Sequence, residues 1–277
     1  SVAHFRAALE TTALVDNYGS EKPWQHRQAL FGRYSIISKY GHFEGLLSLK
    51  QEIADGELAP FSPSLGIKIR ARYNLLIKSS ISRNYRIPTL NHLHWQPGGN
   101  RELLPEKGWS QDVAIQYRNS LNRWSASVTF FNTNATDWIT WLPGDDGIWT
   151  PQNVAKVWSR GIESSVWVRA GFGKCLLYFS GGHNFVLATN QKSRFPNDQS
   201  LNKQLIYTPK HVARGSIQLI YKQFKVMYHH SFTSLRYTTA DNSDEVPGYQ
   251  NGEVKFSQTI HKPTCLLYTS DAADDQA

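Results

Sequence analysis

The chain has 277 residues, a formal net charge of +8 and a mean hydropathy of −0.46. No run approaches the ~18 apolar residues of a membrane-spanning helix, and the basic residues do not gather on one predicted face, as nucleic-acid binding would require. The two cysteines, Cys175 and Cys265, lack metal-ligand spacing and are too few for a disulfide framework.

Apolar and polar residues alternate with a period of two along most of the chain, and helical periodicity is nearly absent. For example, Leu47 and Leu49 lie on the opposite strand face from Ser48. The alternation predicts about twelve strands, many of roughly ten to fifteen residues, against about five or six in globular proteins. They are expected at residues 2–14, 26–39, 42–54, 64–71, 73–84, 109–120, 122–141, 157–171, 174–188, 209–221, 223–238 and 249–261.

Strand chemistry and connection lengths indicate the fold class. Aromatic residues make up 13% of the chain, and many stand at the ends of apolar strand faces, opposite faces with charges in mid-strand. Short turns alternate with long loops, which are expected at 85–108, 142–156, 189–208 and 239–248. This combination predicts an all-β fold, part of an antiparallel transmembrane β-barrel with tight periplasmic turns and long extracellular loops. A soluble all-β binding module also alternates and is the alternative.

Residues 73–117 carry the most informative motif, two alternating strands around a loop rich in Pro and Gly. Pro88 has no N–H and cannot extend strand pairing. It also holds Ile87 in an extended conformation. The segment from Arg86 to Thr89 is therefore expected to mark where the barrel wall ends and the loop begins.

Residues 79–95 read Ser-Ser-Ile-Ser-Arg-Asn-Tyr-Arg-Ile-Pro-Thr-Leu-Asn-His-Leu-His-Trp, and 104–106 read Leu-Pro-Glu. In order and spacing these segments resemble a strand–loop–strand motif of TonB-dependent outer-membrane receptors. His92 and His94 depart from it, because an acidic residue and an aromatic are common there. The arrangement at residues 147–163 resembles cobalamin-receptor-like members, and the resemblance to the family as a whole covers about 30–260. Its structural motif residues are Arg86, Pro88, Thr89, Pro105 and Glu106, together with Arg160, Gly161 and Glu163 of an Arg-Gly-Ile-Glu turn.

The resemblance implies a 22-stranded barrel with a plug domain, of which this chain would supply about twelve strands and no plug. It implies an active-transport receptor in the outer membrane of a Gram-negative bacterium, with a cobalamin or an iron chelate (siderophore) as substrate. The implied partners are outer-membrane lipid, the substrate, and the TonB complex acting through the plug. No enzyme activity and no cofactor are implied. A passive porin or an outer-membrane barrel enzyme is the alternative.

Both ends of the chain are expected to be truncated. The sequence starts at Ser1 without an initiator Met or a signal peptide. Residues 265–274 resemble the translation of an adapter used in DNA library preparation. The expected division is therefore a partial barrel at 1–264 and a non-native tail at 265–277. Because open sheet edges cannot satisfy their backbone groups in lipid, the isolated chain is expected neither to fold nor to transport.

Candidate binding residues lie in the predicted loops. Ligand contact is expected from His92, His94, Trp95, Asn100, Trp141 and Trp149, with a solvated loop or an interfacial aromatic girdle as the alternative. In an extended segment, His92 and His94 would share one orientation. Calcium prefers oxygen ligands, and its candidates are Asp145, Asp146, Asp241 and Asp244, with exposed loop tips as the alternative. No catalytic site emerges, since nucleophile-elbow spacing is missing. His229 and His230 point to opposite faces of one strand and so are not expected to bind a metal together.

Overall fold

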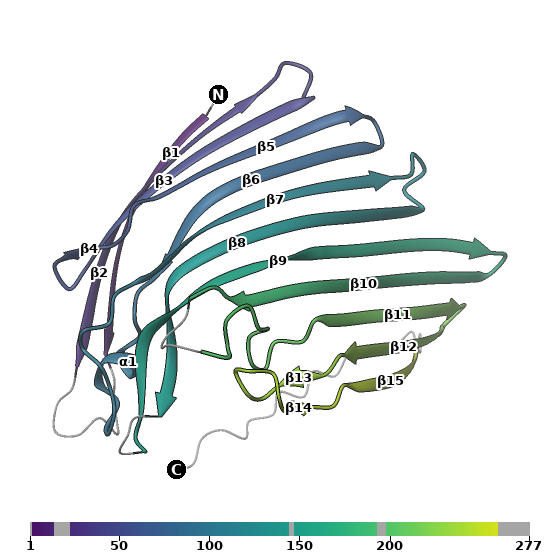
Figure 1. Ribbon diagram of the computed structural model, residues 1–277. Coiled ribbons are helices and arrows are strands. Elements are labelled where there is room, and N and C mark those ends of the chain that lie inside the picture. The colour runs from purple at the N-terminus through teal and green to yellow at the C-terminus, as the bar shows by residue number, and fades with distance from the viewer. Residues whose placement is uncertain (1, 14–22, 144–146, 193–197, 260–277) are drawn as a thin grey trace, which may run out of the picture.

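A computed structural model describes residues 2–13, 23–143, 147–192 and 198–259. Its main feature is a large antiparallel sheet whose strands follow one another in chain order (Figure 1). The strands along this path are β1 (Val2–Ala13), β2 (Trp24–Ile37), β3 (Phe43–Ala54), β5 (Ser62–Arg72), β6 (Leu75–Arg86), β7 (Glu106–Arg118), β8 (Trp124–Pro143), β9 (Trp149–Phe172), β10 (Cys175–Asn190), β11 (His211–Tyr221), β12 (Phe224–Thr233) and β15 (Tyr249–Gln258).

Three two-residue strands complete the described β-structure. β4 (Glu57–Leu58) pairs with the end of β3, and β13 (Arg236–Tyr237) pairs with β14 (Glu245–Val246). The predicted all-β antiparallel fold is confirmed, and the main path has the predicted number of strands. Most of their bounds differ by a few residues, but the strand expected at 157–171 begins eight residues earlier, at Trp149. The strand expected at 223–238 ends at Thr233, because β13 turns away to pair with β14.

The connections alternate in length between the two ends of the sheet. One end has short turns, at 38–42, 73–74, 119–123, 173–174 and 222–223. Gly173 and Lys222 take positive φ angles of 60° and 52° in two of them, as tight hairpins require. The other end has the longer connections, including 87–105, 191–210 and 234–248. We call these the turn end and the loop end; in outer-membrane barrels they face the periplasm and the cell exterior.

The two faces of the sheet differ in chemistry. On one face Lys68 Nζ donates to Glu44 Oε1 at 2.7 Å across neighbouring strands. Hollows open on this polar face, and Glu163 and Arg214 line one of them. The opposite face carries apolar side chains such as Ile115, which is 44% exposed. The polar face therefore lines the lumen, and the apolar face points outward to lipid.

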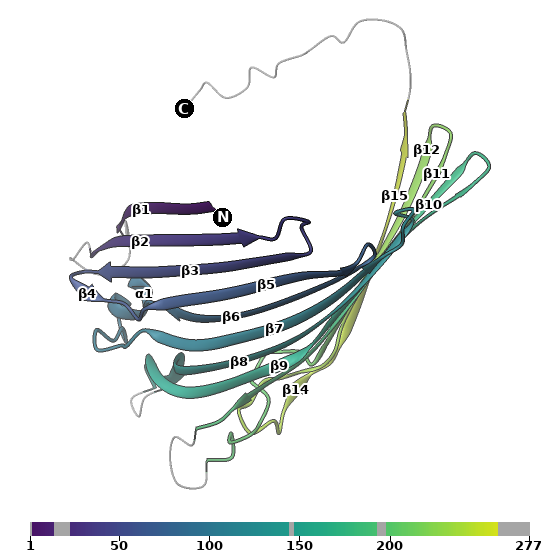
Figure 2. The same cartoon turned by 90° about the horizontal axis from the view of Figure 1, so that it is seen from above.

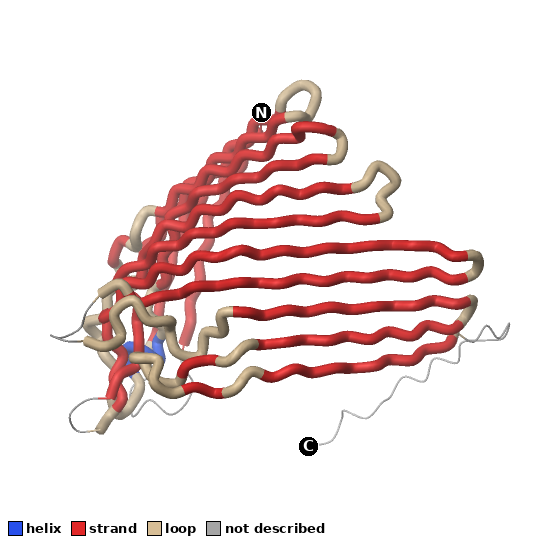
Figure 3. Tube along the Cα trace, turned by 45° about the vertical axis from the view of Figure 1, so that its right-hand side comes forward, coloured by secondary structure: helices blue, strands red, loops and turns tan. Residues whose placement is uncertain are grey.

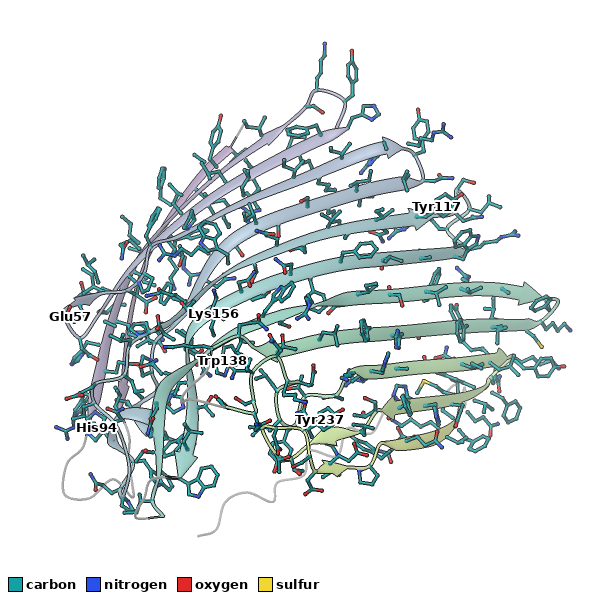
Figure 4. The ribbon with its side chains drawn as sticks, in the orientation of Figure 1. Glu57, His94, Tyr117, Trp138, Lys156 and Tyr237 are labelled. Carbon is teal, nitrogen blue, oxygen red and sulfur yellow. The ribbon has the colours of Figure 1, made fainter. Side chains whose placement is uncertain are left out.

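Aromatic side chains gather at the turn end of the outward face. The rings of Tyr117 and Trp124 lie 4.9 Å apart between centroids, and Phe172 and Tyr221 are exposed nearby. Figure 4 shows Tyr117 at the turn end, far from His94 among the loops. Aromatic rings at this level are expected to form the girdle at the membrane boundary.

The sheet curves into an open wall. Seen from above, β1 and β15 lie at opposite ends of the arc and do not meet (Figure 2). Figure 3 shows the long strands running side by side, with the loops gathered at one end. The described strands therefore form a curved wall and leave two unpaired edges, along β1 and β15.

The prediction of a long loop at 142–156 is wrong. β8 and β9 instead continue as a hairpin, with pairing from Trp138–Ala155 out to Pro143–Trp149. A β-bulge around Asp137 shifts the register, and Asp137 takes a φ of 58°. The bulge redirects the hairpin rather than ending it, because Trp, Ile and Thr beyond it favour strand structure.

The loop between β6 and β7 contains a helix that the alternation pattern did not predict. α1 (Leu90–His94) has five residues, and Thr89 is its N-cap. Within the described part of the chain, this helix is far too short to cross a bilayer, and no other helix is found there. The pattern missed it because one helical turn shows no periodicity.

Candidate functional site

An ion pair closes the base of the loop between β6 and β7. Arg86, the last residue of β6, donates from Nε to Glu106 Oε2 at 2.7 Å and from Nη2 to Oε1. The Glu106 side chain is buried, at 7% exposure, and also accepts the backbone N–H of Ile139 at 2.8 Å. A two-pronged guanidinium–carboxylate contact is strong and fixes its geometry. The predicted motif residues Arg86 and Glu106 thus tie the loop base to β8.

A second set of contacts holds the loop on the β8–β9 hairpin. Asn153 Nδ2 donates to the carbonyl oxygens of Asp137 at 2.6 Å and Leu104 at 2.9 Å, while its Oδ1 accepts the Leu104 N–H at 2.8 Å. Lys107 Nζ lies 3.0 Å from Asp137 Oδ2. The bulge at Asp137 is therefore braced from both sides. No local pattern indicated the Asn153 contacts, because they join residues far apart in the chain.

α1 positions His92 against an aromatic ring of the hairpin. The Thr89 side chain accepts from the His92 N–H, and the His92 ring accepts from the Thr89 N–H at 3.4 Å. The His92 and Trp141 ring centroids are 6.1 Å apart. Partial burial first, and the positive charge of Arg86 second, lower the pKa of His92. Two predicted ligand candidates, His92 and Trp141, therefore meet.

The expectation that His92 and His94 share an orientation is wrong. The segment is helical, and residues two apart on a helix do not face each other. Trp95 follows as the C-cap of α1 and is 43% exposed. The structure thus places His92 and His94 on different sides of α1.

Asn100 and the glycines near it dock the loop onto β9. Asn100 Nδ2 donates to the Pro151 carbonyl at 3.1 Å, and its Oδ1 accepts the Glu102 N–H at 2.9 Å. At Gly98, with φ of 111°, a Cβ would collide with the Trp149 carbonyl. The Asn100 side chain is therefore engaged in holding the loop. The motif residue Pro88 is buried just before the helix, and Pro105 is half-buried just before β7.

A cavity of about 550 Å³ opens between the hairpin and the loop after β10. Its aromatic wall is Trp138, Trp141 and Trp149, and Figure 4 shows Trp138 where the hairpin meets these loops. The other lining residues come from β8, β10 and the loops: Ile139, Thr140, Leu142, Asn190, Ser200, Lys203, Gln204, Leu205, Ile206, Thr208 and Ala240. Three indoles with one ammonium suit a large apolar or aromatic ligand.

Hydrogen bonds hold the loop side of this cavity in place. Gln204 Oε1 accepts the Ala188 N–H at 3.1 Å, and its Nε2 donates to the Thr208 carbonyl at 3.2 Å. Asn190 Nδ2 donates to Ser200 Oγ at 2.9 Å, and Asn242 Nδ2 to the Gln204 carbonyl at 2.9 Å. The cavity wall is therefore built before any ligand arrives. Sequence reasoning missed residues 198–208, because nothing in their local pattern shows what they dock against.

The calcium candidates are only partly described. Asp145 and Asp146 lie outside the described residues. Asp241 accepts from the N–H and Oγ of Ser243 at 3.1 and 2.8 Å. Hydrogen bonds from Thr239 and then Ser243 lower the pKa of Asp241 to about 2. Asp244 accepts from Thr238 Oγ1 at 3.1 Å. In the described part of the chain, no three His, Cys, Asp or Glu side chains form a metal-binding group.

The prediction of an Arg-Gly-Ile-Glu turn is wrong, because these residues lie in the middle of β9. The guanidinium of Arg160 stacks 3.7 Å from the Trp158 ring centroid and donates to Thr189 Oγ1 at 3.0 Å. At Gly161 a Cβ would collide with the Phe185 carbonyl. Glu163 lines a hollow of the lumen face. The pairing of β9 with both neighbours is continuous here, which leaves no room for a turn.

These features are those of the wall of an outer-membrane receptor barrel: long antiparallel strands, an apolar outward face, a polar lumen face and a cavity at the loop end. A family model described as "TonB dependent receptor-like, beta-barrel" matches residues 32–252. The chain therefore belongs to this family of TonB-dependent receptors, which are outer-membrane transporters of Gram-negative bacteria and not enzymes. The resemblance, the location and the absence of enzyme activity predicted from the sequence are confirmed.

Two relatives are similar in sequence. The vitamin B12 transporter BtuB of Photobacterium profundum is 26% identical over 201 residues, which cover 70% of this chain and 31% of that protein. The vitamin B12 transporter BtuB of Vibrio vulnificus is 32% identical over 101 residues, 36% of this chain and 16% of the relative. The chain thus spans about a third or less of these relatives.

Solved structures share the fold. The siderophore receptor PiuA from Acinetobacter baumannii matches with a TM-score of 0.69 and 15% identity, over 86% of this chain and 37% of that one. The copper transporter OprC matches with a TM-score of 0.71 and 11% identity, over 94% and 46% of the two chains. At these identities the likeness establishes the fold alone.

Proposed function

We propose that this chain is barrel wall from an active-transport receptor that takes up a scarce nutrient, either a cobalamin or an iron chelate. The observation that carries the proposal is the cavity at the loop end, with its wall of Trp138, Trp141 and Trp149. It opens where an extracellular ligand would arrive, and three indoles favour large ligands with apolar or conjugated surfaces. The names of the relatives, vitamin B12 transporters and a siderophore receptor, support both substrate classes.

We further propose that transport energy comes from the TonB complex, acting on a plug domain inside the closed barrel. The chain spans 31% of the Photobacterium relative, which leaves room for further strands and a plug in a receptor of that length. In this proposal residues 1–264 belong to the wall and 265–277 do not. The structure describes nothing beyond residue 259.

Uptake by the full-length receptor tests this proposal. The receptor would be expressed in a strain without its own cobalamin receptor, and uptake of labelled cyanocobalamin and of ferric siderophores would be measured with and without TonB. We expect TonB-dependent uptake of one class. Uptake that persists without TonB would indicate a passive porin instead.

Two variants test whether the cavity binds the ligand. Trp141→Ala should weaken ligand binding by about tenfold or more, as loss of a central aromatic contact does. The matched control is Trp124→Ala, which removes an indole from the turn-end girdle and should leave ligand affinity unchanged. Equal affinities of both variants and the parent receptor would reject the cavity as the binding site.

A further inference from the structure

Two histidines meet on the outward face of the wall. His183 of β10 and His211 at the start of β11 are both exposed. His183 Nε2 lies 3.2 Å from His211 Nδ1, and the rings are 5.3 Å apart between centroids with 22° between their planes. The strand register makes them a diagonal pair, since His183 lies opposite Ala213 and His211 opposite Phe185.

The pair lies near the outer edge of the apolar band. On β9, its neighbours on the same face are Ser164 and Ile162, opposite His183 and Phe185. The next outward-facing residue toward the loop end is Arg160, where the surface becomes polar. Imidazoles beside apolar side chains at this level are costly unless their nitrogens have partners, so the pair requires a physical explanation.

The distance between the two nitrogens fits a shared metal ion. Imidazole nitrogens lie about 2.0–2.1 Å from zinc, so nitrogens 3.2 Å apart would subtend an angle of about 100° at the metal. That angle lies between the square-planar and tetrahedral values preferred by copper, nickel and zinc. Because both ligands come from paired strands, the sheet holds them at this spacing.

We propose that His183 and His211 form a two-histidine site for a borderline divalent transition-metal ion, such as Cu²⁺, Ni²⁺ or Zn²⁺, with water in the remaining positions. Other histidines of these strands lack the arrangement. His229 faces the lumen, and His230 Nδ1 is 2.9 Å from Tyr228 Oη. This site is independent of the transport proposal, because it lies on the outward face and not in the loop-end cavity.

The competing explanation is a simple hydrogen bond between two neutral rings, because 3.2 Å also fits N–H···N geometry. A metal ion needs both facing nitrogens unprotonated, whereas the hydrogen bond needs a proton on one of them. Metal titration of the full-length receptor therefore separates the two explanations.

The experiment uses the full-length receptor in detergent, stripped with a chelator and titrated with Cu²⁺ by calorimetry and electron paramagnetic resonance. The parent receptor should bind one ion at this site with two nitrogen ligands. His183→Ala or His211→Ala should each weaken binding by about a hundredfold, as loss of one of two linked ligands does.

His229→Ala is the matched control, since it removes a histidine from the opposite face of a neighbouring strand, and it should bind Cu²⁺ as the parent does. His183→Gln keeps a polar side chain of similar reach and replaces the alanine variant if that variant does not fold. Heat-modifiable migration on gels verifies that the barrel of each variant is folded. Unchanged Cu²⁺ affinity in the folded His183 and His211 variants, or a one-nitrogen spectrum in the parent, would overturn the proposal in favour of the hydrogen-bonded pair.

Discussion

At the scale of single residues, Glu106 holds the base of the loop between β6 and β7. Its carboxylate is buried and accepts from Arg86 and from the Ile139 N–H. Glu106→Ala would leave the buried N–H without a partner and release the guanidinium. We expect the free energy of unfolding of the full-length receptor to fall by about 1–3 kcal/mol, measured by urea denaturation in detergent. Glu57→Ala, at an exposed strand end, should change it by less than about 0.5 kcal/mol.

His92 should make the stability of this loop depend on pH. Its ring accepts the Thr89 N–H and so must be neutral, and burial followed by Arg86 lowers its pKa. The unfolded chain therefore binds the proton more readily than the folded one. The stabilisation that the neutral His92 ring provides is complete above the ordinary histidine pKa. It is lost as the pH falls through the lower pKa that His92 has in the folded protein. The difference in unfolding free energy between the parent and His92→Gln should shrink in that window; a constant difference from about pH 7.5 to about pH 5 would contradict this.

At the scale of elements, β9 depends on a close backbone approach at Gly161. A Cβ there would collide with the Phe185 carbonyl and the Phe131 ring. Gly161→Ala should destabilise the full-length barrel by about 1–3 kcal/mol, because overpacking forces the strands apart. Gly171→Ala is the control in the same strand, where the nearest atom is Leu176 Cδ2 at 3.6 Å. Equal unfolding midpoints for the two variants would show that β9 tolerates the added atom.

Elements also show which parts of the structure the sequence could predict. Period-two alternation identified the long strands because each has one apolar and one polar environment. It missed α1, which is one turn held by Thr89 and His92, and it mistook the β8–β9 extension for a loop. The same contrast between predicted and missed features holds for the candidate site. Arg86 and Glu106 belong to a local motif, whereas Gln204 lines the cavity only because residues 198–208 fold back on β10.

At the scale of the whole molecule, the open edges decide what the isolated chain can do. β1 and β15 are the two edges of the described sheet and lie at opposite ends of the arc (Figure 2), so among the described residues the outer side of each has no strand partner. In lipid each unsatisfied group costs several kcal/mol, so only a closed barrel is stable there. We therefore expect the 277-residue chain, refolded alone into detergent or liposomes, to show no heat-modifiable band on gels. The full-length receptor proposed above, treated in the same way, should show one, because a closed ring of strands has no open edge. A heat-modifiable band from the chain alone would mean that its edges find partners, with each other or with a second copy.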